Sequence, residues 1–215
     1  DAGSLTINSD RLIVADGGQI TASTRGPGNG GTAQINAQSS VEITGIAPNN
    51  RPSRVSARTE GRGDAGNLII STRRLTVSDG GEANVSSSIS PSGSVGSVGS
   101  VGSVGTPLGA AGNLNINASE VRLDTGGTLN ANTAAGERGN INIVSDDIRL
   151  RRGSQISTNA QTARGGNIDI DTEILTALED SDITANAIEG PGGQVIINTT
   201  GIFGTEFRDE TTSQS

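Results

Sequence analysis

A short glycine-led motif recurs along the chain and constrains the fold more than any single residue does. In each copy a glycine is followed by two aliphatic residues that are separated by one residue, in the pattern Gly-x-Leu-x-Ile or a close variant. Copies begin at Gly3, Gly66, Gly112, Gly139, Gly166 and Gly193. From Leu114 onward the step between copies is constant at 27 residues. A period of about 20 to 50 residues is typical of solenoids, propellers and other repeat arrays.

Each repeat contains three segments in which apolar and polar residues alternate. Leu5–Ile7, Leu75–Val77 and Ile183–Ala185 are examples of the first, second and third segment. Alternation with a period of two predicts strands with one buried face. Glycine pairs such as Gly17-Gly18 and Gly80-Gly81 precede the third segment. We expect these glycines to supply positive φ and to let the backbones of successive coils approach closely.

The sequence therefore predicts an all-β fold, a right-handed parallel β-helix of about seven coils, the seventh incomplete. Each coil would contain roughly 27 residues and three short strands, and each strand would pair with its equivalent in the next coil. The composition agrees, because glycine accounts for 32 of 215 residues and aromatic residues for 1%. Small aliphatic side chains can fill thin coils that cover one another, whereas a compact globule needs more apolar mass.

We expect a single β-helix domain over residues 1–208 and a flexible C-terminal tail over 209–215. Two departures from the repeat spacing predict loop insertions near 44–54 and 88–110. The second insertion contains a repeated Gly-Ser-Val tripeptide over residues 93–105. Alternating small residues of this kind predict a flexible loop outside the rod.

The repeat resembles a known family of secreted proteins. The Gly-Asn-Leu-x-Ile unit, the Leu-x-Val…Asp-Gly-Gly-x-Ile-x-Ala-x-Thr continuation and Gly201-Ile-Phe-Gly204 are similar to the repeat regions of filamentous haemagglutinin-like exoproteins, in the cyanobacterial branch of two-partner secretion. The resemblance covers residues 3–208. It implies a right-handed parallel β-helix, passage through an outer-membrane secretion partner, a secreted or cell-surface location, and a role in adhesion.

Charge and residue types exclude several classes of function. The net charge is −8, and an acidic surface repels phosphate, so we expect no nucleic-acid partner. No apolar run approaches the roughly 20 residues of a membrane span, so we expect no membrane insertion. His, Cys, Tyr and Lys are absent, and most acids fall at turns. We therefore expect no enzyme, cofactor or metal site, although Asp169 and Asp171 lie on the same face of one predicted strand.

The outward positions of the third strands form a polar candidate surface for glycans or a protein partner. Stacked amides and hydroxyls can alternatively form ladders that only stabilise the rod. Arg54 and Arg58 also belong to a basic cluster with Arg51 and Arg62, for which an anionic glycan is a candidate ligand. The candidate surface comprises Thr21, Ser23, Arg54, Arg58, Asn84, Asn130, Asn132, Asn159, Thr184 and Asn186.

Three hypotheses of function follow from this reading. The first is a non-enzymatic structural rod of a secreted or cell-surface adhesin or extracellular fibre. The second is a carbohydrate-binding β-helix module. The third is a self-assembling subunit of a head-to-tail filament, because a solenoid exposes strand edges at its ends. Phe203 and Phe207 are the only aromatic residues, and their place after the last repeat predicts a partial cap at that end.

Overall fold

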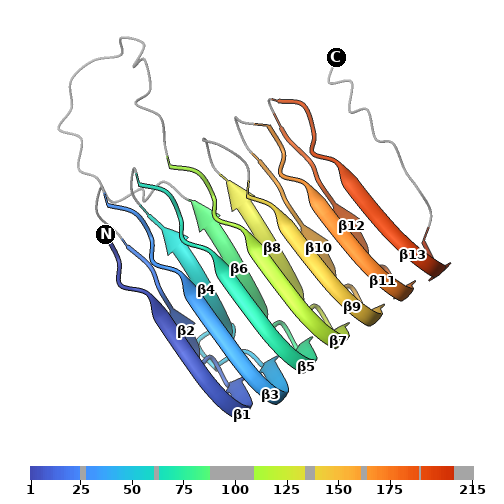
Figure 1. The fold of residues 1–215 in the computed structure, drawn as a ribbon, viewed down its shortest axis with the longest axis horizontal. Coiled ribbons are helices and arrows are strands. Elements are labelled where there is room, and N and C mark those ends of the chain that lie inside the picture. Colours follow the sequence, from blue (N-terminus) through green and yellow to red (C-terminus); the bar gives the residue numbers. More distant parts are fainter. Residues whose placement is uncertain are drawn as a thin grey trace.

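The computed structural model is a stack of coils built from two parallel sheets (Figure 1). It describes residues 1–24, 28–60, 63–87, 109–133, 139–160, 164–188 and 190–205. Within these residues all regular secondary structure is β-strand. Each strand pairs in parallel with its equivalent in the next coil, which confirms the predicted parallel β-helix. The right-handed winding stays a prediction.

A seven-stranded sheet, here called the long sheet, and a six-stranded sheet, here called the short sheet, contain the strands in chain order. The long sheet contains β1 (Leu5–Ala15), β3 (Ala33–Thr44), β5 (Leu68–Ser78), β7 (Leu114–Asp124), β9 (Ile141–Leu150), β11 (Ile168–Ala177) and β13 (Val195–Phe203). The short sheet contains β2 (Gln19–Thr21), β4 (Arg54–Thr59), β6 (Glu82–Ser87), β8 (Thr128–Thr133), β10 (Gln155–Ser157) and β12 (Asp182–Thr184). Coils 1 to 6 thus hold one strand of each sheet, and coil 7 is represented by β13.

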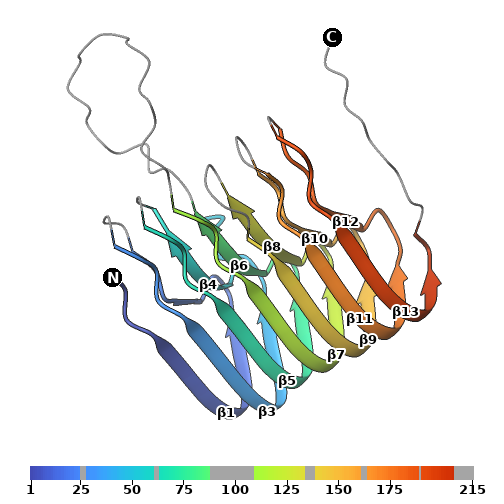
Figure 2. The ribbon, with the colours of Figure 1, turned by 45° about the horizontal axis from the view of Figure 1, so that its top comes forward.

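Each coil contains two strands rather than the three expected, because the first two segments form one long strand with a bend. In β5, Leu68 and Ile70 are buried, Arg73 and Arg74 both point outward, and burial resumes at Leu75. Two consecutive outward residues reverse the alternation at the bend. The parallel pairing resumes after the bend, with a register shift between β1 and β3 and between β3 and β5. Hydroxyls at the bend support it, since Thr172 Oγ1 donates to the carbonyl of Ile174 at 3.2 Å. Figure 2 shows the long strands curving through this bend.

The core is a set of aliphatic columns that run along the rod. One column holds an isoleucine in all seven coils: Ile7, Ile35, Ile70, Ile116, Ile143, Ile170 and Ile197. The five inner members are at most 2% exposed. In coil 3 the apolar residues of the alternating segments, from Leu68 to Ala83, are buried. At one outward position Arg122 and Arg149 face solvent and Thr76 is half-buried. The inward and outward phases read from the sequence are therefore confirmed.

A tight corner precedes each long strand. At Gly166 an added Cβ would lie 1.8 Å from the Gly139 carbonyl oxygen, so the backbones of neighbouring coils touch there. In coils 3 to 6 an asparagine follows the corner glycine and joins the coils. Asn140 Oδ1 accepts from the Asn167 amide at 2.9 Å, and Asn113 Oδ1 accepts from the Asn140 amide at 3.2 Å. This asparagine ladder fixes the corner in addition to the core.

The insertion near 44–54 is an ordered part of the rod. Ile46 and Pro52 form an antiparallel bridge, and the Ala47 amide donates to the Arg51 carbonyl at 2.8 Å. Ser53 is fully buried, and its Oγ accepts from the Gly17 amide at 2.9 Å. The insertion therefore closes over the neighbouring turn of coil 1. Most of the insertion near 88–110, the Gly-Ser-Val repeat and the tail over 209–215 lie outside the described residues.

The predicted cap is not provided by Phe203. Its ring lies back over Gly201, and the side chain is 58% exposed on the outer side of β13. Ile202, which points inward, is 39% exposed. Phe207 lies outside the described residues. Phe203 takes the outward phase because it follows the inward Ile202 by one residue, so it cannot cover the core end.

Candidate functional site

The short sheet brings the predicted polar surface together as two columns. In the first column Thr21, Ser56, Asn84, Asn130, Ser157 and Thr184 are neighbours in register. The second column lies two residues further along each strand, with Arg58, Ser86 and Asn132 as register neighbours. The register predicted from the repeat phase thus holds for these residues, and they share one face of the short sheet.

Exposure is uneven across this face. Thr21, Ser23, Asn159 and Asn186 are exposed, whereas Ser56 and Ser157 are 2% and 6% exposed. The other predicted members are half-buried: Arg54, Arg58, Asn84, Asn130, Asn132 and Thr184. Among the described residues this face is therefore not an evenly accessible polar plane, and its exposed positions lie in coil 1 and in coils 5 and 6.

Several of these side chains bond to one another along the stack. Ser56 Oγ donates to Thr21 Oγ1 at 3.2 Å, and Asn132 Oδ1 accepts from the Asn159 amide at 2.9 Å. Arg54 pairs with Glu82 at 2.7 Å, and Arg58 pairs with Glu60 at 3.3 Å. The positive charge of these two arginines is thus neutralised within the fold, which weakens the case for an anionic ligand there. Arg51 is exposed, and Arg62 lies outside the described residues.

Asn84 and Asn130 each carry a buried polar atom without a hydrogen bond to the described residues, and Thr128 Oγ1 on the same face is a third such atom. Their Oδ1 atoms are buried and accept no hydrogen bond from the described residues. The two side chains are register neighbours. Because a buried carbonyl oxygen without a donor costs about 1–3 kcal/mol, the pair favours a bridging water or a hydroxyl donor at this point.

Sequence reasoning missed two shallow hollows on the opposite side of the molecule, at the bend of the long sheet. The first, of about 530 Å³, is lined by Asn8, Ser9, Asn36, Ala37, Gln38, Ser71 and Thr72. The second, of about 370 Å³, is lined by Asn117, Ala118, Ser119, Val144, Ser145, Asp146, Asp171, Thr172, Glu173 and Thr200. The same bend in different coils makes both hollows, so they form one line along the rod, here called the bend groove. The bend groove could have been predicted only if the sequence had shown that the first two segments form one bent strand.

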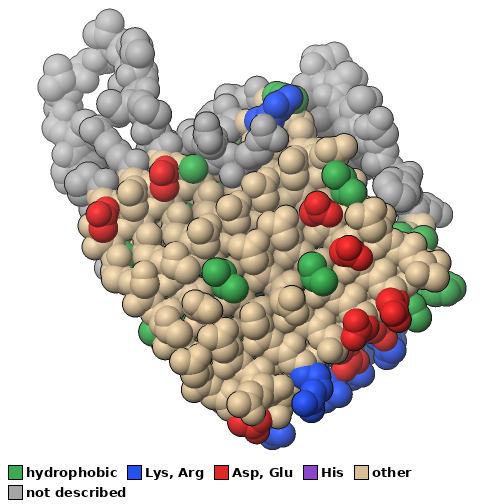
Figure 3. Space-filling view, in the orientation of Figure 1, with side chains coloured by type: hydrophobic (Ala, Val, Ile, Leu, Met, Phe, Trp, Pro, Cys, Tyr) green, Lys and Arg blue, Asp and Glu red, His purple; other side chains and the backbone are tan. Residues whose placement is uncertain are grey.

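Charge divides the bend groove. Its first hollow is lined by uncharged residues, whereas Asp146, Asp171 and Glu173 line the second. Figure 3 shows one face on which most of the surface is uncharged and charged side chains gather toward one edge. A neutral, hydroxyl-rich ligand would therefore suit the first hollow, while the second would repel anions.

An ion-pair cluster lies beside the bend in the middle coils. Glu120 accepts from Arg74 Nε at 2.6 Å and also pairs with Arg122. Burial raises the pKa of the Glu120 carboxyl, but the hydrogen bonds from Arg74 and Arg122 outweigh it, so the pKa lies below its ordinary value. Asp147 similarly pairs with Arg149 at 2.6 Å. These contacts join neighbouring strands and positions two apart, so they stabilise the bend rather than prepare a reactive carboxyl.

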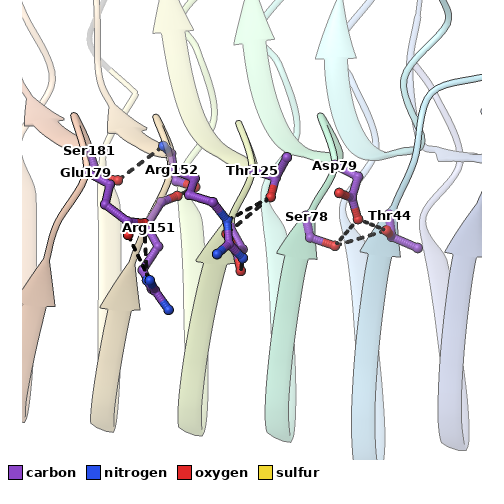
Figure 4. A network of polar contacts seen from close by, with 10 residues as sticks. Thr44, Ser78, Asp79, Thr125, Arg151, Arg152, Glu179 and Ser181 are labelled. Atoms are coloured by element: carbon purple, nitrogen blue, oxygen red, sulfur yellow. Dashed lines mark hydrogen bonds and ion pairs between the residues drawn. The ribbon is translucent and has the colours of Figure 1, made fainter.

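A second polar network follows the turns between the long and short strands (Figure 4). Asp79 Oδ2 accepts from Thr44 Oγ1 and from Ser78 Oγ, each at 3.0 Å. Further along the rod, Arg151 donates to Glu179 at 2.8 Å, and its hydrogen bond is the main reason that the pKa of the Glu179 carboxyl is lowered. The network is exposed, and it joins the turns of neighbouring coils.

A line of buried hydroxyls inside the short sheet was also missed. Thr59, Ser87 and Thr133 are register neighbours at inward positions and at most 5% exposed. Ser87 Oγ and Thr133 Oγ1 lie 3.0 Å apart, so the hydroxyls satisfy one another along the stack. Their place four residues after inward Val55, Ala83 and Leu129 is the signal that could have found them.

The acidic pair Asp169 and Asp171, considered in the sequence, has no further acid as a register neighbour in β9 or β13. Asp169 and Asp171 are exposed on one face of β11, and their register neighbours in β9 are Asn142 and Val144. Across the described ranges no group of three or more His, Cys, Asp or Glu side chains could hold a metal ion. A search of the same ranges finds no helix with the length and apolar character needed to cross a membrane.

The comparisons with known proteins do not identify a family. No family model, curated protein or solved structure matches the chain. The resemblance to filamentous haemagglutinin-like exoproteins therefore rests on the repeat motif and stays a prediction. A proposal of function can therefore draw only on the parallel β-helix and on its polar and charged surfaces.

Proposed function

We propose that the chain is a non-enzymatic structural rod of a secreted or cell-surface adhesin or extracellular fibre. The observation that carries this proposal is the isoleucine column, which passes through every coil from Ile7 to Ile197. Each coil covers the core of the next, so stability grows with the number of coils and the stack resists bending. Such a stack is suited to holding other domains at a distance.

The surface supports a structural role over catalysis. Some acids of the bend and the turns are bound by arginines, as in the pairs Arg74–Glu120 and Arg151–Glu179. Carboxylates held ionised in this way cannot serve as general acids near neutral pH. The exposed pair Asp169 and Asp171 lacks a third titratable group among its register neighbours. These acids therefore give little support to a general acid–base site.

The location is inferred from the resemblance to two-partner exoproteins. A chain without cysteine needs no disulfide chemistry during export, which suits passage through an outer-membrane secretion partner. We therefore place the rod outside the cell, where adhesion to another surface is its role.

Labelling of intact cells tests this function. An antibody raised against the purified chain should label intact cells that produce the protein, and brief protease treatment should remove the label. A cytoplasmic protein serves as the control for cell integrity. Labelling that requires permeabilised cells would contradict the proposal.

A second candidate function, carbohydrate binding, is favoured by the bend groove. Its first hollow offers amides and hydroxyls from Asn8, Asn36, Ser71 and Thr72, spaced by the distance between strands. A neutral linear polysaccharide lying along the rod could bond to successive coils. This site differs from the predicted short-sheet face, where half-burial limits access.

Retardation of the chain in gels that contain a soluble neutral glucan tests the second function. Asn36→Ala should reduce retardation, because Asn36 lines the first hollow. Asn186→Ala, at an exposed position of the short-sheet face, is the matched control. Equal loss in both variants, or no retardation of the native chain, would remove the bend groove as a glycan site.

A further inference from the structure

The bend of the long sheet carries opposite charges in different coils. In coil 3 its two outward residues, Arg73 and Arg74, are both exposed. In coil 5 the same two positions hold Asp146 and Asp147, because Arg74 lies in register with Glu120 of coil 4 and Glu120 lies in register with Asp147. Positive and negative side chains lie next to one another along one edge of the molecule (Figure 3). The bend is thus basic on one side of coil 4 and acidic on the other.

Arg73 and Asp146 are left over from the internal ion pairs. Their neighbours Arg74 and Asp147 both take part in ion pairs within the rod. In the part of the chain that the structure describes, the side chains of Arg73 and Asp146 have neither a hydrogen bond nor an ion pair. Both residues are exposed. Two unpaired charges of opposite sign, at the same position two coils apart, are available to a partner that carries the same pattern in reverse.

A second copy of the chain carries that reversed pattern. When two rods lie side by side and antiparallel, with a two-fold axis running along the strands at coil 4, coil 3 of each copy faces coil 5 of the other. Such an axis keeps each residue at the same place along its strand. Arg73 of one copy therefore faces Asp146 of the other, and Arg74 faces Asp147.

We propose that two copies of the chain associate side by side through the bend in this antiparallel arrangement. The contact between Arg73 and Asp146 forms twice, once on each side of the axis, so the surface is complementary to itself and closes a dimer. The dimer goes beyond the proposed rod function. Its absence would leave the cell-surface role untouched, and failure of surface labelling would leave the dimer untouched.

The residues at the axis do not oppose this contact. Ser119, the exposed and uncharged counterpart of Arg73 in coil 4, faces its own equivalent in the second copy. Glu120 also faces its equivalent, but it forms an ion pair with Arg122 and its side chain is 17% exposed. Each copy brings the same ion pair to the axis, so the four charges that meet there sum to zero.

Other arrangements of the same edges are less favourable. Two parallel rods in register would place each charge against its own equivalent. Antiparallel rods with the axis between coils 4 and 5 would place Glu120 against Asp147 and Arg122 against Arg149. An axis between coils 3 and 4 would leave the two unpaired charges opposite uncharged residues. Because like charges across an interface disfavour binding, the charges select the axis at coil 4.

The strength of the contact follows from its position. It runs along one edge of the rod, so it is narrow and its ion pairs stay near solvent. Exposed ion pairs contribute little each and are screened by salt. We therefore expect a weak dimer that forms at about 0.5 mM chain and about 20 mM salt, and that dissociates at about 0.5 M salt. Analytical ultracentrifugation distinguishes the two states.

Exchange of the two charges tests the pairing. Arg73→Asp alone and Asp146→Arg alone should each raise the dissociation constant about tenfold or more, because each change brings like charges together twice. An equimolar mixture of the two variants should restore dimerisation to near the native level, since each contact regains opposite charges. Asp169→Arg, at an exposed acid of β11 away from the bend, is the control and should dimerise as the native chain does.

Disulfide formation tests the axis, because the chain has no cysteine of its own. Ser119→Cys chains should link to one another under mild oxidation, since Ser119 lies at the axis. Thr200→Cys chains, at the same position of coil 7, should link several-fold less. Equal linkage of the two variants would indicate parallel rods and overturn the arrangement. The proposal also fails if the native chain stays monomeric at low salt, or if the mixture of charge-exchanged variants does not dimerise.

Discussion

Two columns of glycine run along the rod, and they are required for different reasons. The corner column precedes the long strands and comprises Gly3, Gly31, Gly66, Gly112, Gly139, Gly166 and Gly193. Its inner members have no room for a Cβ, as at Gly166, where the Gly139 oxygen lies 1.8 Å from it. The turn column follows the long strands and comprises Gly17, Gly80, Gly126 and Gly153, with φ between +69° and +80°. At Gly126 and Gly153 nothing lies within 4 Å of an added Cβ.

The two columns therefore differ in what they tolerate. Coil 6 makes the turn without glycine, using Glu179 and Asp180 at φ values of 57° and 58°. The corner column contains glycine in all seven coils. A torsional demand can be met by another residue at a modest cost, whereas a collision with the backbone of the next coil cannot.

The largest expected effect is at the corner column. Gly166→Ala should destabilise the chain by about 3 kcal/mol or more, because the new methyl must displace a neighbouring backbone. Urea denaturation followed by circular dichroism measures the change. Gly3→Ala is the matched control, since nothing lies within 4 Å of that position, and its stability should change little. Equal losses in the two variants would show that close approach is not what the corner requires.

The asparagine ladder sharpens the comparison at the same corner. Asn140→Ala removes the acceptor of the Asn167 amide and the donor to Asn113 Oδ1. We expect a loss of about 2 kcal/mol, because a half-buried amide is left without its partner. Asn142→Ala removes an exposed amide ladder contact to Asn115 and should cost well under this amount. If the two variants have the same denaturation midpoint, the corner ladder adds no more to the stability of the chain than the exposed ladder does.

The turn column should respond more weakly. Gly153→Ala meets no neighbouring atom but retains a φ of +69°, so its cost is the left-handed torsion, about 1 kcal/mol. The comparison with Gly166→Ala is direct, because the same methyl is added in each case. If Gly153→Ala lowers the free energy of unfolding as much as Gly166→Ala does, the turn column and the corner column do not differ in what they require.

The repeat phase predicted the coils, the inward residues and the register, because those depend on a period that the sequence displays. Leu68, Leu75 and Ala83 are inward in the structure as in the prediction. Positive φ at Gly80 was expected, as was the close approach of coils at Gly81, where an added Cβ would lie 2.3 Å from the Ile43 oxygen. These features are local consequences of the motif.

The bend was not predictable in the same way. Arg73 and Arg74 both face outward in β5, and nothing in the alternation says whether the chain stops there or continues as one strand. The bend groove and the pairing of Glu120 with Arg74 depend on that continuity. The half-burial of Asn84 and Asn130 was missed for another reason, since exposure depends on neighbours in adjacent coils and not on the phase within one.

The smallest effect has the opposite sign and lies at the one turn that lacks glycine. Asp180 holds a φ of 58°, which an L-residue adopts at some cost and which aspartate tolerates better than most residues. Asp180→Gly relieves that torsion but gains freedom in the unfolded chain, so we expect a net stabilisation of about 0.5 kcal/mol. The Arg151–Glu179 ion pair should persist, because it involves the preceding residue.

Asp180→Ala is the control: it retains the torsion and removes the carboxylate, so it should be no more stable than the native chain. If Asp180→Ala stabilises as much as Asp180→Gly, charge rather than torsion governs this turn, and the turn column would no longer be defined by φ.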